Sequence, residues 1–169
     1  MERRREIHPI APLFDANSRV LILGSFPSVK SREAMFFYGH PQNRFWRVLA
    51  DIFGETPPQT IAEKESLALR HGVALWDVIA QCEIAGSSDA SITNIVPNDL
   101  SVILSAADIH AVFCNGNTSY FYYHKYCRAK TGRDAVALPS TSPANARWTR
   151  EKLAEAWGAA LIPYLSSGH

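Results

Sequence analysis

Several markers of well-known protein classes are missing from this sequence of 169 residues. The three cysteines, Cys82, Cys114 and Cys127, are widely separated and form no C-x-x-C pair, which argues against a zinc ribbon or a four-cysteine iron–sulfur cluster. No uninterrupted apolar run approaches the roughly 20 residues that span a membrane, and the charged amino-terminal segment has no apolar core of a signal peptide. We therefore expect buried thiols, no membrane association and a cytoplasmic location.

A strong charge of one sign is also missing, since 17 basic side chains stand against 16 acidic ones. A nucleic-acid partner would therefore depend on where the basic groups lie, and not on their excess. The six histidines show no metal-ligand spacing, and the sequence contains no G-x-G-x-x-G, G-x-x-x-x-G-K-[ST], G-x-S-x-G or H-E-x-x-H motif. We expect no metal and no cofactor, and we expect the basic clusters at 3–5 and 128–133 to be solvated.

The composition that remains, 47% hydrophobic and 20% charged, is typical of one globular domain. We expect this domain to span residues 1–169, with residues 1–9 as a flexible lead-in. Apolar runs bounded by turn residues predict buried strands at 19–23, 72–77, 110–114 and 135–138. Helical spacing and capping signals predict helices over 43–53, 60–70, 98–107 and 146–161, with another after 115–117. This alternation predicts a three-layer α/β/α fold with a mainly parallel sheet.

In such folds ligands bind beyond the carboxyl ends of the strands, which are followed here by the loops 24–43, 115–118 and 139–145. Two of these loops carry dense polar and aromatic motifs. The first reads LGSFPS over 23–28 and continues as FFYGHPQNRFW over 36–46, and the second reads LPSTSPAN over 138–145. On these motifs the sequence resembles the uracil-DNA glycosylase superfamily, in particular its mismatch-specific enzymes and its hypoxanthine-DNA glycosylase branch. The likeness runs roughly from Ile10 to Leu161.

Two departures narrow this resemblance. Phe26 stands where the mismatch-specific enzymes hold a catalytic Asn and the uracil enzymes an Asp, and Leu138 stands where the uracil enzymes begin the second motif with His. Both argue against an efficient uracil-only enzyme. They favour the hypoxanthine branch, whose members are similar to this chain in the Gly-Ser-Phe-Pro-Ser segment, and in that branch the resemblance implies that Asn43 takes the catalytic role.

The chemistry of base removal gives further residues a role. A glycosylase must flip the nucleotide, grip its base and stabilise a cationic sugar while the base leaves. Stacking is worth about 1–3 kcal/mol per base, and we expect Tyr38 to supply it with Phe26 on the opposite wall, unless both pack in the core. The Asn43 carbonyl oxygen could position water, or the side chain could cap a helix. His40 could donate to the leaving base or a phosphate, or bond the backbone. Gly24 and Ser25 complete the expected base pocket.

The DNA backbone is expected to meet the same loops. Hydroxyl and N–H groups of Ser28, Ser140 and Ser142 could bind phosphates, although turn chemistry also explains serine there. The segment Pro143, Ala144, Asn145 and Arg147 occupies the place where the family inserts a wedge into the gap left by the flipped base. Three further segments, 76–77, 87–89 and 115–117, lie near the expected pocket without an assigned contact.

The resemblance implies a monofunctional DNA N-glycosylase that removes a deaminated base and leaves an abasic site. Neither motif contains a lysine that could form a Schiff base with the sugar. We expect hypoxanthine as the main substrate, with uracil and xanthine as further candidates. The expected partner is double- or single-stranded DNA carrying such a base, and no protein partner is required.

Three rival hypotheses stay open. One is an enzyme of the same family whose main substrate is uracil mismatched with guanine. Another is a DNA-binding module of the same fold without catalysis, which Phe26 and Leu138 favour. The third is an unrelated doubly wound domain that binds a small phosphorylated ligand.

Overall fold

A four-stranded parallel sheet forms the centre of the molecule. The computed structural model describes residues 3–85 and 91–165. The sheet has the order β3-β2-β6-β7, and all three pairings are parallel. Each strand falls within one residue of its predicted position because short apolar runs ended by turn residues are strong strand signals. The bounds are Val73–Asp77 for β3, Val20–Gly24 for β2, Ala111–Asn115 for β6 and Ala135–Leu138 for β7.

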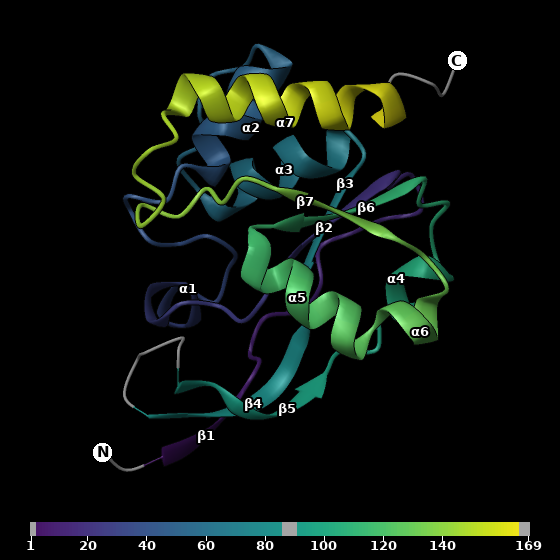
Figure 1. Cartoon of the computed structure of the whole chain (residues 1–169). Helices are drawn as coiled ribbons and strands as arrows, with labels where there is room; N and C mark the ends of the chain where they lie inside the picture. The colour runs from purple at the N-terminus through teal and green to yellow at the C-terminus, as the bar shows by residue number, and fades with distance from the viewer. Residues whose placement is uncertain (1–2, 86–90, 166–169) are drawn as a thin grey trace.

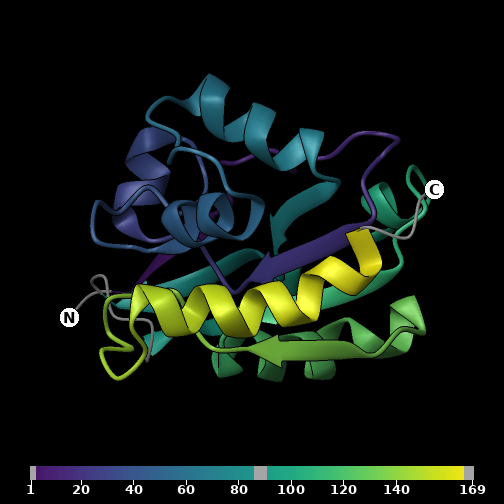
Figure 2. The same cartoon turned by 90° about the horizontal axis from the view of Figure 1, so that it is seen from above.

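Helices cover both faces of this sheet. Helices α2, α3 and α7 lie on one side of the sheet and α5 lies on the other, as Figures 1 and 2 show from two directions. Their bounds are Phe45–Phe53, Ile61–Arg70, Arg150–Leu165 and Asn117–Tyr126. The predicted three-layer fold is therefore confirmed.

The small antiparallel sheet β1-β4-β5 was not predicted. It consists of Arg3–Ile7, Ile79–Ala85 and Thr93–Pro97. The expectation of a flexible lead-in over residues 1–9 is wrong for 3–7, which pair with β4 in register from Arg3 opposite Ala85 to Ile7 opposite Gln81. An edge strand of this kind gains its order from the backbone of its neighbour, and its mostly exposed side chains leave no apolar pattern in the sequence.

The helix predictions succeeded where the signals were local. Thr60 caps α3 by accepting a hydrogen bond from the Glu63 N–H at 3.1 Å, as predicted. Helix α4 is shorter than expected, and α7 begins four residues later than expected because the preceding segment is held as a loop. The short helices α1 and α6 were not predicted. Their bounds are Ser101–Leu104 for α4, Val29–Ala34 for α1 and Arg128–Thr131 for α6.

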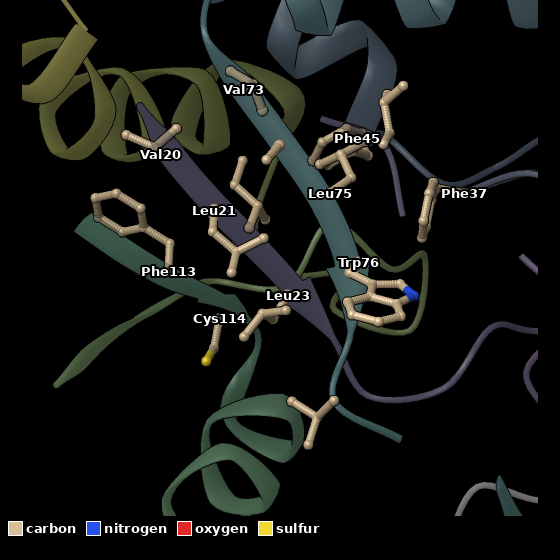
Figure 3. Close-up of a cluster of buried hydrophobic side chains, with 14 of the residues drawn as sticks. Val20, Leu21, Leu23, Phe37, Phe45, Val73, Leu75, Trp76, Phe113 and Cys114 are labelled. Carbon is tan, nitrogen blue, oxygen red and sulfur yellow. The ribbon is translucent and has the colours of Figure 1, made fainter. Parts of the chain in front are cut away.

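The apolar side chains of the sheet and helices form one core, part of which Figure 3 shows around β2, β3 and β6. Leu21 and Leu75 from neighbouring strands are fully buried there, together with Phe45 from α2. All three cysteines are buried, as expected. Burial raises the pKa of Cys114 to about 12 and that of Cys127 to about 11, so these two thiols are poor nucleophiles.

Candidate active site

A cleft of about 800 Å³ opens where β2, β6 and β7 end at their carboxyl termini. The loops that follow these strands line it, as the fold predicted. Every residue predicted for the site lines the cleft, except the exposed Arg147. These lining residues are Gly24, Ser25, Phe26, Ser28, Tyr38, His40, Asn43, Ser140, Ser142, Pro143, Ala144 and Asn145. The predicted positions at 87–89 lie outside the described residues.

Arg44 fastens the second motif to the first. Its guanidinium donates to the backbone carbonyls of Ser142 at 2.7 Å, Asn145 at 3.1 Å and Thr141 at 3.3 Å, and also to the carbonyl of Trp148. A planar fork with five N–H donors suits such a ring of carbonyls. One side chain therefore sets the shape of the cleft wall across about 100 residues of sequence.

The two aromatic residues that follow Arg44 are part of the core. Trp46 donates its indole N–H to the carbonyl of Phe37 at 3.0 Å, which ties α2 to the loop before it. Phe45 is fully buried, and its ring stacks on Tyr38 with centroids 4.1 Å apart. Much of the motif that carries the family resemblance therefore serves to build the cleft.

Asn43 stands at the start of α2. Its Oδ1 accepts hydrogen bonds from the Phe45 N–H at 2.9 Å and from the Thr141 hydroxyl at 2.8 Å. Because a carbonyl oxygen has two lone pairs, both are used inside the protein. The capping alternative holds in a shifted form, because Arg44 occupies the N-cap position and the Asn43 side chain bonds the first N–H of α2 from one residue before it. The carbonyl oxygen is therefore not free to hold water as expected. The amide Nδ2 group, which donates to no described residue, is the part of Asn43 that is left for a substrate.

Tyr38 adopts a backbone conformation that is rare for a side chain of its size. Its φ of 54° lies in the left-handed region, which costs about 1–2 kcal/mol for a non-glycine residue. Phe45 covers one face of the ring, so only the other face is left for the predicted stacking. Burial first, and then the nearby Asp77 carboxylate, raise the pKa of Tyr38 well above its ordinary value. The hydroxyl therefore stays protonated at physiological pH.

His40 presents one defined ring nitrogen to the cleft. Its Nδ1 accepts a hydrogen bond from the Gln42 N–H at 3.1 Å, so the hydrogen of the neutral ring resides on Nε2. The bond to the backbone is the expected alternative, and the Nε2–H group on the other side of the ring is the donor that the predicted role would use.

The predicted phosphate-binding serines are engaged in turns. Ser28 caps α1 by accepting from the Ser31 N–H, while Ser140 and Ser142 accept from backbone N–H groups two residues ahead. These are the turn interactions that serine also predicts. The Ser28 hydroxyl also donates to Ser31 Oγ at 3.2 Å, whereas the hydroxyls of Ser140 and Ser142 keep their hydrogens for another acceptor. Pro143 and Ala144 are exposed at the tip of the loop, where a wedge would have to lie.

Phe26 is only 9% exposed, and its position combines the two expected alternatives. It packs edge-on against His8, with centroids 5.9 Å apart, and the Arg32 guanidinium lies over its ring. It also lines the cleft, so it is both a core residue and a wall of the site.

Sequence reasoning missed the pair His8 and Asp77 and the role of Asn115. His8 Nε2 lies 2.7 Å from Asp77 Oδ2, with both side chains almost fully buried. Asn115 donates to the Thr141 hydroxyl and accepts from the Thr141 N–H, which continues the hydrogen-bond chain to Asn43. These contacts join positions far apart in the chain, and the signal that the sequence gave was the position of Asp77 and Asn115 at the ends of predicted strands.

The described residues contain no cluster of three or more metal-ligating side chains. In the same residues, no helix is both long enough and apolar enough to cross a membrane.

A parallel sheet between two helical layers, with a polar cleft at the carboxyl ends of its strands, defines an α/β protein of the ligand-binding or enzymatic kind. Comparison with known proteins narrows this class. The family model described as the uracil DNA glycosylase superfamily matches residues 11–161. The chain therefore belongs to the uracil DNA glycosylase superfamily and is a DNA glycosylase by family, which confirms the resemblance inferred from the two motifs.

Individual relatives agree with this assignment. The chain is 32% identical over 144 residues to a hypoxanthine DNA glycosylase of Methanosarcina acetivorans, covering 85% of this chain and 90% of the relative. It is 36% identical over 138 residues to a hypoxanthine DNA glycosylase of Methanosarcina barkeri, covering 80% and 86%. The solution NMR structure of a candidate uracil DNA glycosylase from M. acetivorans superposes with a TM-score of 0.78 at 29% identity, covering 93% and 96%.

Proposed function

We propose that this glycosylase removes hypoxanthine from DNA by hydrolysing its N-glycosidic bond. Uracil and xanthine are proposed as further substrates, and the DNA is proposed to be double- or single-stranded. The observation that carries the proposal is the cleft, where the Asn43 side chain is held by two groups of the protein with its amide hydrogens left for a substrate. The relatives named hypoxanthine DNA glycosylases support the choice of base.

Asn43 acts in this proposal through Nδ2. A departing base leaves an oxocarbenium-like sugar, and such a cation reacts with water that has not been deprotonated. An N–H donor can hold that water by one lone pair while another lone pair faces the sugar. His40 Nε2–H is the second donor, directed at the leaving base or a phosphate.

The product is proposed to be an intact strand with an abasic site. Cleavage through a Schiff base needs an amine close to the sugar. None of the described residues that line the cleft is a lysine. Covalent trapping with borohydride is therefore expected to fail.

The test is base release from a duplex with a single deoxyinosine, with a deoxyuridine duplex beside it, scored by alkali cleavage at abasic sites. Asn43→Ala removes both the amide and a helix cap, so its control is Thr60→Ala, which removes the cap of α3 away from the cleft. Each loses about 1 kcal/mol of stability. We expect release from deoxyinosine to collapse in Asn43→Ala and to persist in Thr60→Ala.

Asn43→Asp separates two roles for this side chain. The variant keeps an oxygen for the Phe45 N–H and the Thr141 hydroxyl but replaces the Nδ2 donor with an acceptor. We expect it to fold and to lose most base release. A rate equal to or above that of the original protein would show that water is held by an acceptor, contrary to the proposal.

The rival of a binding module without catalysis is favoured by Phe26 and Leu138, which line the cleft where related enzymes carry polar residues. Tight binding of the deoxyinosine duplex without release of any base would support it. Release from deoxyuridine alone would instead keep the enzyme and change its substrate.

A further inference from the structure

Strand β1 carries three consecutive exposed arginines, Arg3, Arg4 and Arg5, which we call the β1 arginines. Arg3 donates to the carbonyl of Ser91 at 2.6 Å, and Arg5 donates to the side-chain oxygen of Gln81 at 3.3 Å. Arg4 makes no hydrogen bond or ion pair with any described residue. Hydrogen bonds to neutral oxygens leave the charge of a guanidinium in place. One exposed strand therefore presents three positive charges without an ion-pair partner among the described residues.

This local charge contrasts with the rest of the chain, whose net charge is only +1. Glu83 stands opposite Arg5 in the pairing of β1 with β4, but one of its oxygens accepts from the Asn94 amide and the described residues contain no ion pair between Glu83 and Arg5. Other arginines do pair with carboxylates, namely Arg32, Arg70, Arg128 and Arg150. The charge of β1 is thus left for a partner outside the chain.

Strand β1 is fixed beside the mouth of the cleft. Glu6 forms an ion pair of 3.0 Å with Arg32 of α1, and α1 lines the cleft through Ser31. His8, the residue directly after the strand, lies 2.7 Å from Asp77 in the lining of the cleft. Figures 1 and 2 show β1, α1 and the 139–149 loop toward the same end of the molecule. The strand is therefore an ordered, basic extension of the surface around the cleft.

The distance from the cleft to the β1 arginines is bounded by the length of the chain. From His8 to Arg3 the chain advances five residues, which span at most about 17 Å when extended. A duplex rises by about 3.4 Å per base pair, so this reach corresponds to at most about five base pairs. Arg4 lies on the same face of the strand as Glu6, because alternate residues share a face, and Glu6 contacts α1. The unpartnered guanidinium of Arg4 is thus on the side of the strand that faces α1.

We propose that the β1 arginines bind DNA phosphates in the duplex that flanks the flipped nucleotide. Charge complementarity identifies this occupant, since the chain belongs to a family of DNA glycosylases and phosphates supply much of the affinity of proteins for DNA. Phosphate contacts carry no sequence information, so this surface adds affinity and orients the duplex without choosing the base. The proposal rests on the proposed function in taking DNA as the substrate.

The test is the salt dependence of binding to an undamaged duplex, measured as the slope of the logarithm of the association constant against that of the salt concentration. Each phosphate contact contributes about 0.9 to the magnitude of this slope. The triple variant Arg3→Gln, Arg4→Gln, Arg5→Gln should lower the magnitude by about two to three. Arg4→Gln alone changes a side chain that bonds no described residue, so it should fold as the original protein does and lower the magnitude by about one.

The control removes the same charge from another face. The triple variant Lys125→Gln, Arg128→Gln, Lys130→Gln changes α5 and α6 at residues that do not line the cleft. Its salt slope should equal that of the original protein. An equal loss in the control and in the β1 triple variant would show an effect of net charge, and would overturn the inference.

The length of the duplex tests where the contacts lie. A duplex with a single 2′-fluoroarabino-inosine, whose glycosidic bond resists hydrolysis, is shortened to about two base pairs on one side of the lesion and then on the other, which is less than the reach of about five. We expect the affinity difference between the original protein and the β1 triple variant to vanish when one flank is shortened and to persist with the other. A difference that survives both changes would contradict contacts to the flanking duplex.

A charged edge strand also guards a sheet against pairing with other molecules. Unchanged salt slopes in both β1 variants, with or without aggregation of the triple variant, would overturn the inference and leave only this guarding role. The result is independent of base release. Release from deoxyinosine with unchanged slopes would overturn this inference alone, whereas reduced slopes in a protein that releases no base would support it and overturn the proposed function.

Discussion

The Arg44 guanidinium holds the cleft wall in place, and Arg44→Lys is predicted to release it. Four carbonyls of the 141–148 segment accept hydrogen bonds from Arg44. Lysine keeps the charge but has one nitrogen, so it can reach about two of them at a time. A hydrogen bond to a charged group is worth about 1.5–3 kcal/mol, and the loss of two at the lower figure is about 3 kcal/mol.

Limited digestion with trypsin measures how often the 141–148 segment opens, because trypsin can cut there at one bond. Within 140–149 its one cleavage site is the bond after Arg147, an exposed residue in the loop that Arg44 holds. Cleavage follows the population of the open form when opening and closing are fast. A loss of about 3 kcal/mol therefore raises the rate of cleavage after Arg147 by about 100-fold.

Arg47→Lys is the matched control, since Arg47 lies in the first turn of α2, three residues after Arg44, and among the described residues it bonds only the carbonyls of Pro41 and Asn43. Its cleavage after Arg147 should match that of the original protein. The reasoning is refuted if Arg44→Lys is as resistant after Arg147 as the control. Base release should fall in Arg44→Lys alone, because the same segment forms the cleft wall.

Three further substitutions test local packing and acid stability. Gly24→Ala places a methyl group 2.4 Å from Asp77 Oδ1, so it should cost about 1–3 kcal/mol in urea unfolding and also weaken base release. Gly158→Ala in α7 meets nothing closer than 3.7 Å and should instead stabilise by up to about 1 kcal/mol without changing base release; equal stability of the two variants would contradict the steric argument. Hydrogen bonds from Arg70 and then from His71 lower the pKa of the Glu55 carboxyl from 4.5 to about 2. The stability that the ionised Glu55 contributes is therefore complete above pH 4.5 and is lost as the pH falls through about 2. Urea midpoints between pH 5 and 2 should therefore fall less steeply in Glu55→Gln, and parallel curves would refute this.

The parts of the fold that the sequence predicted are those governed by local physics. The four parallel strands are short apolar runs with turn residues at their ends, and the start of α3 is marked by a capping residue and its partner three positions later. Strand β1 has no such signal because its partner is β4, about 80 residues further along the chain. Its side chains need not be apolar to pair through the backbone.

The candidate site likewise has a part that local sequence signals predict and a part that they do not. The motif residues could be placed in the cleft because the loops after parallel strands meet at one edge of the sheet. The pair of His8 and Asp77 could not be predicted, since it joins positions 69 residues apart through one hydrogen bond. Because residues 1–9 were expected to form a flexible lead-in, His8 was not considered as a site residue. In the structure His8 directly follows β1 and its side chain is buried.

The motif residues that carry the family resemblance are therefore mostly ones that do not determine the substrate. Arg44, Phe45 and Trp46 bind carbonyls, fill the core and brace a loop, and these tasks are the same for any base. Choice of base needs polar groups that meet its edge, and Asp77 and Asn115 carry such groups in the lining of the cleft. Neither belongs to the two motifs. A relative that keeps the motifs but differs at these two positions should thus keep the fold and the cleft, while its choice of base is free to change.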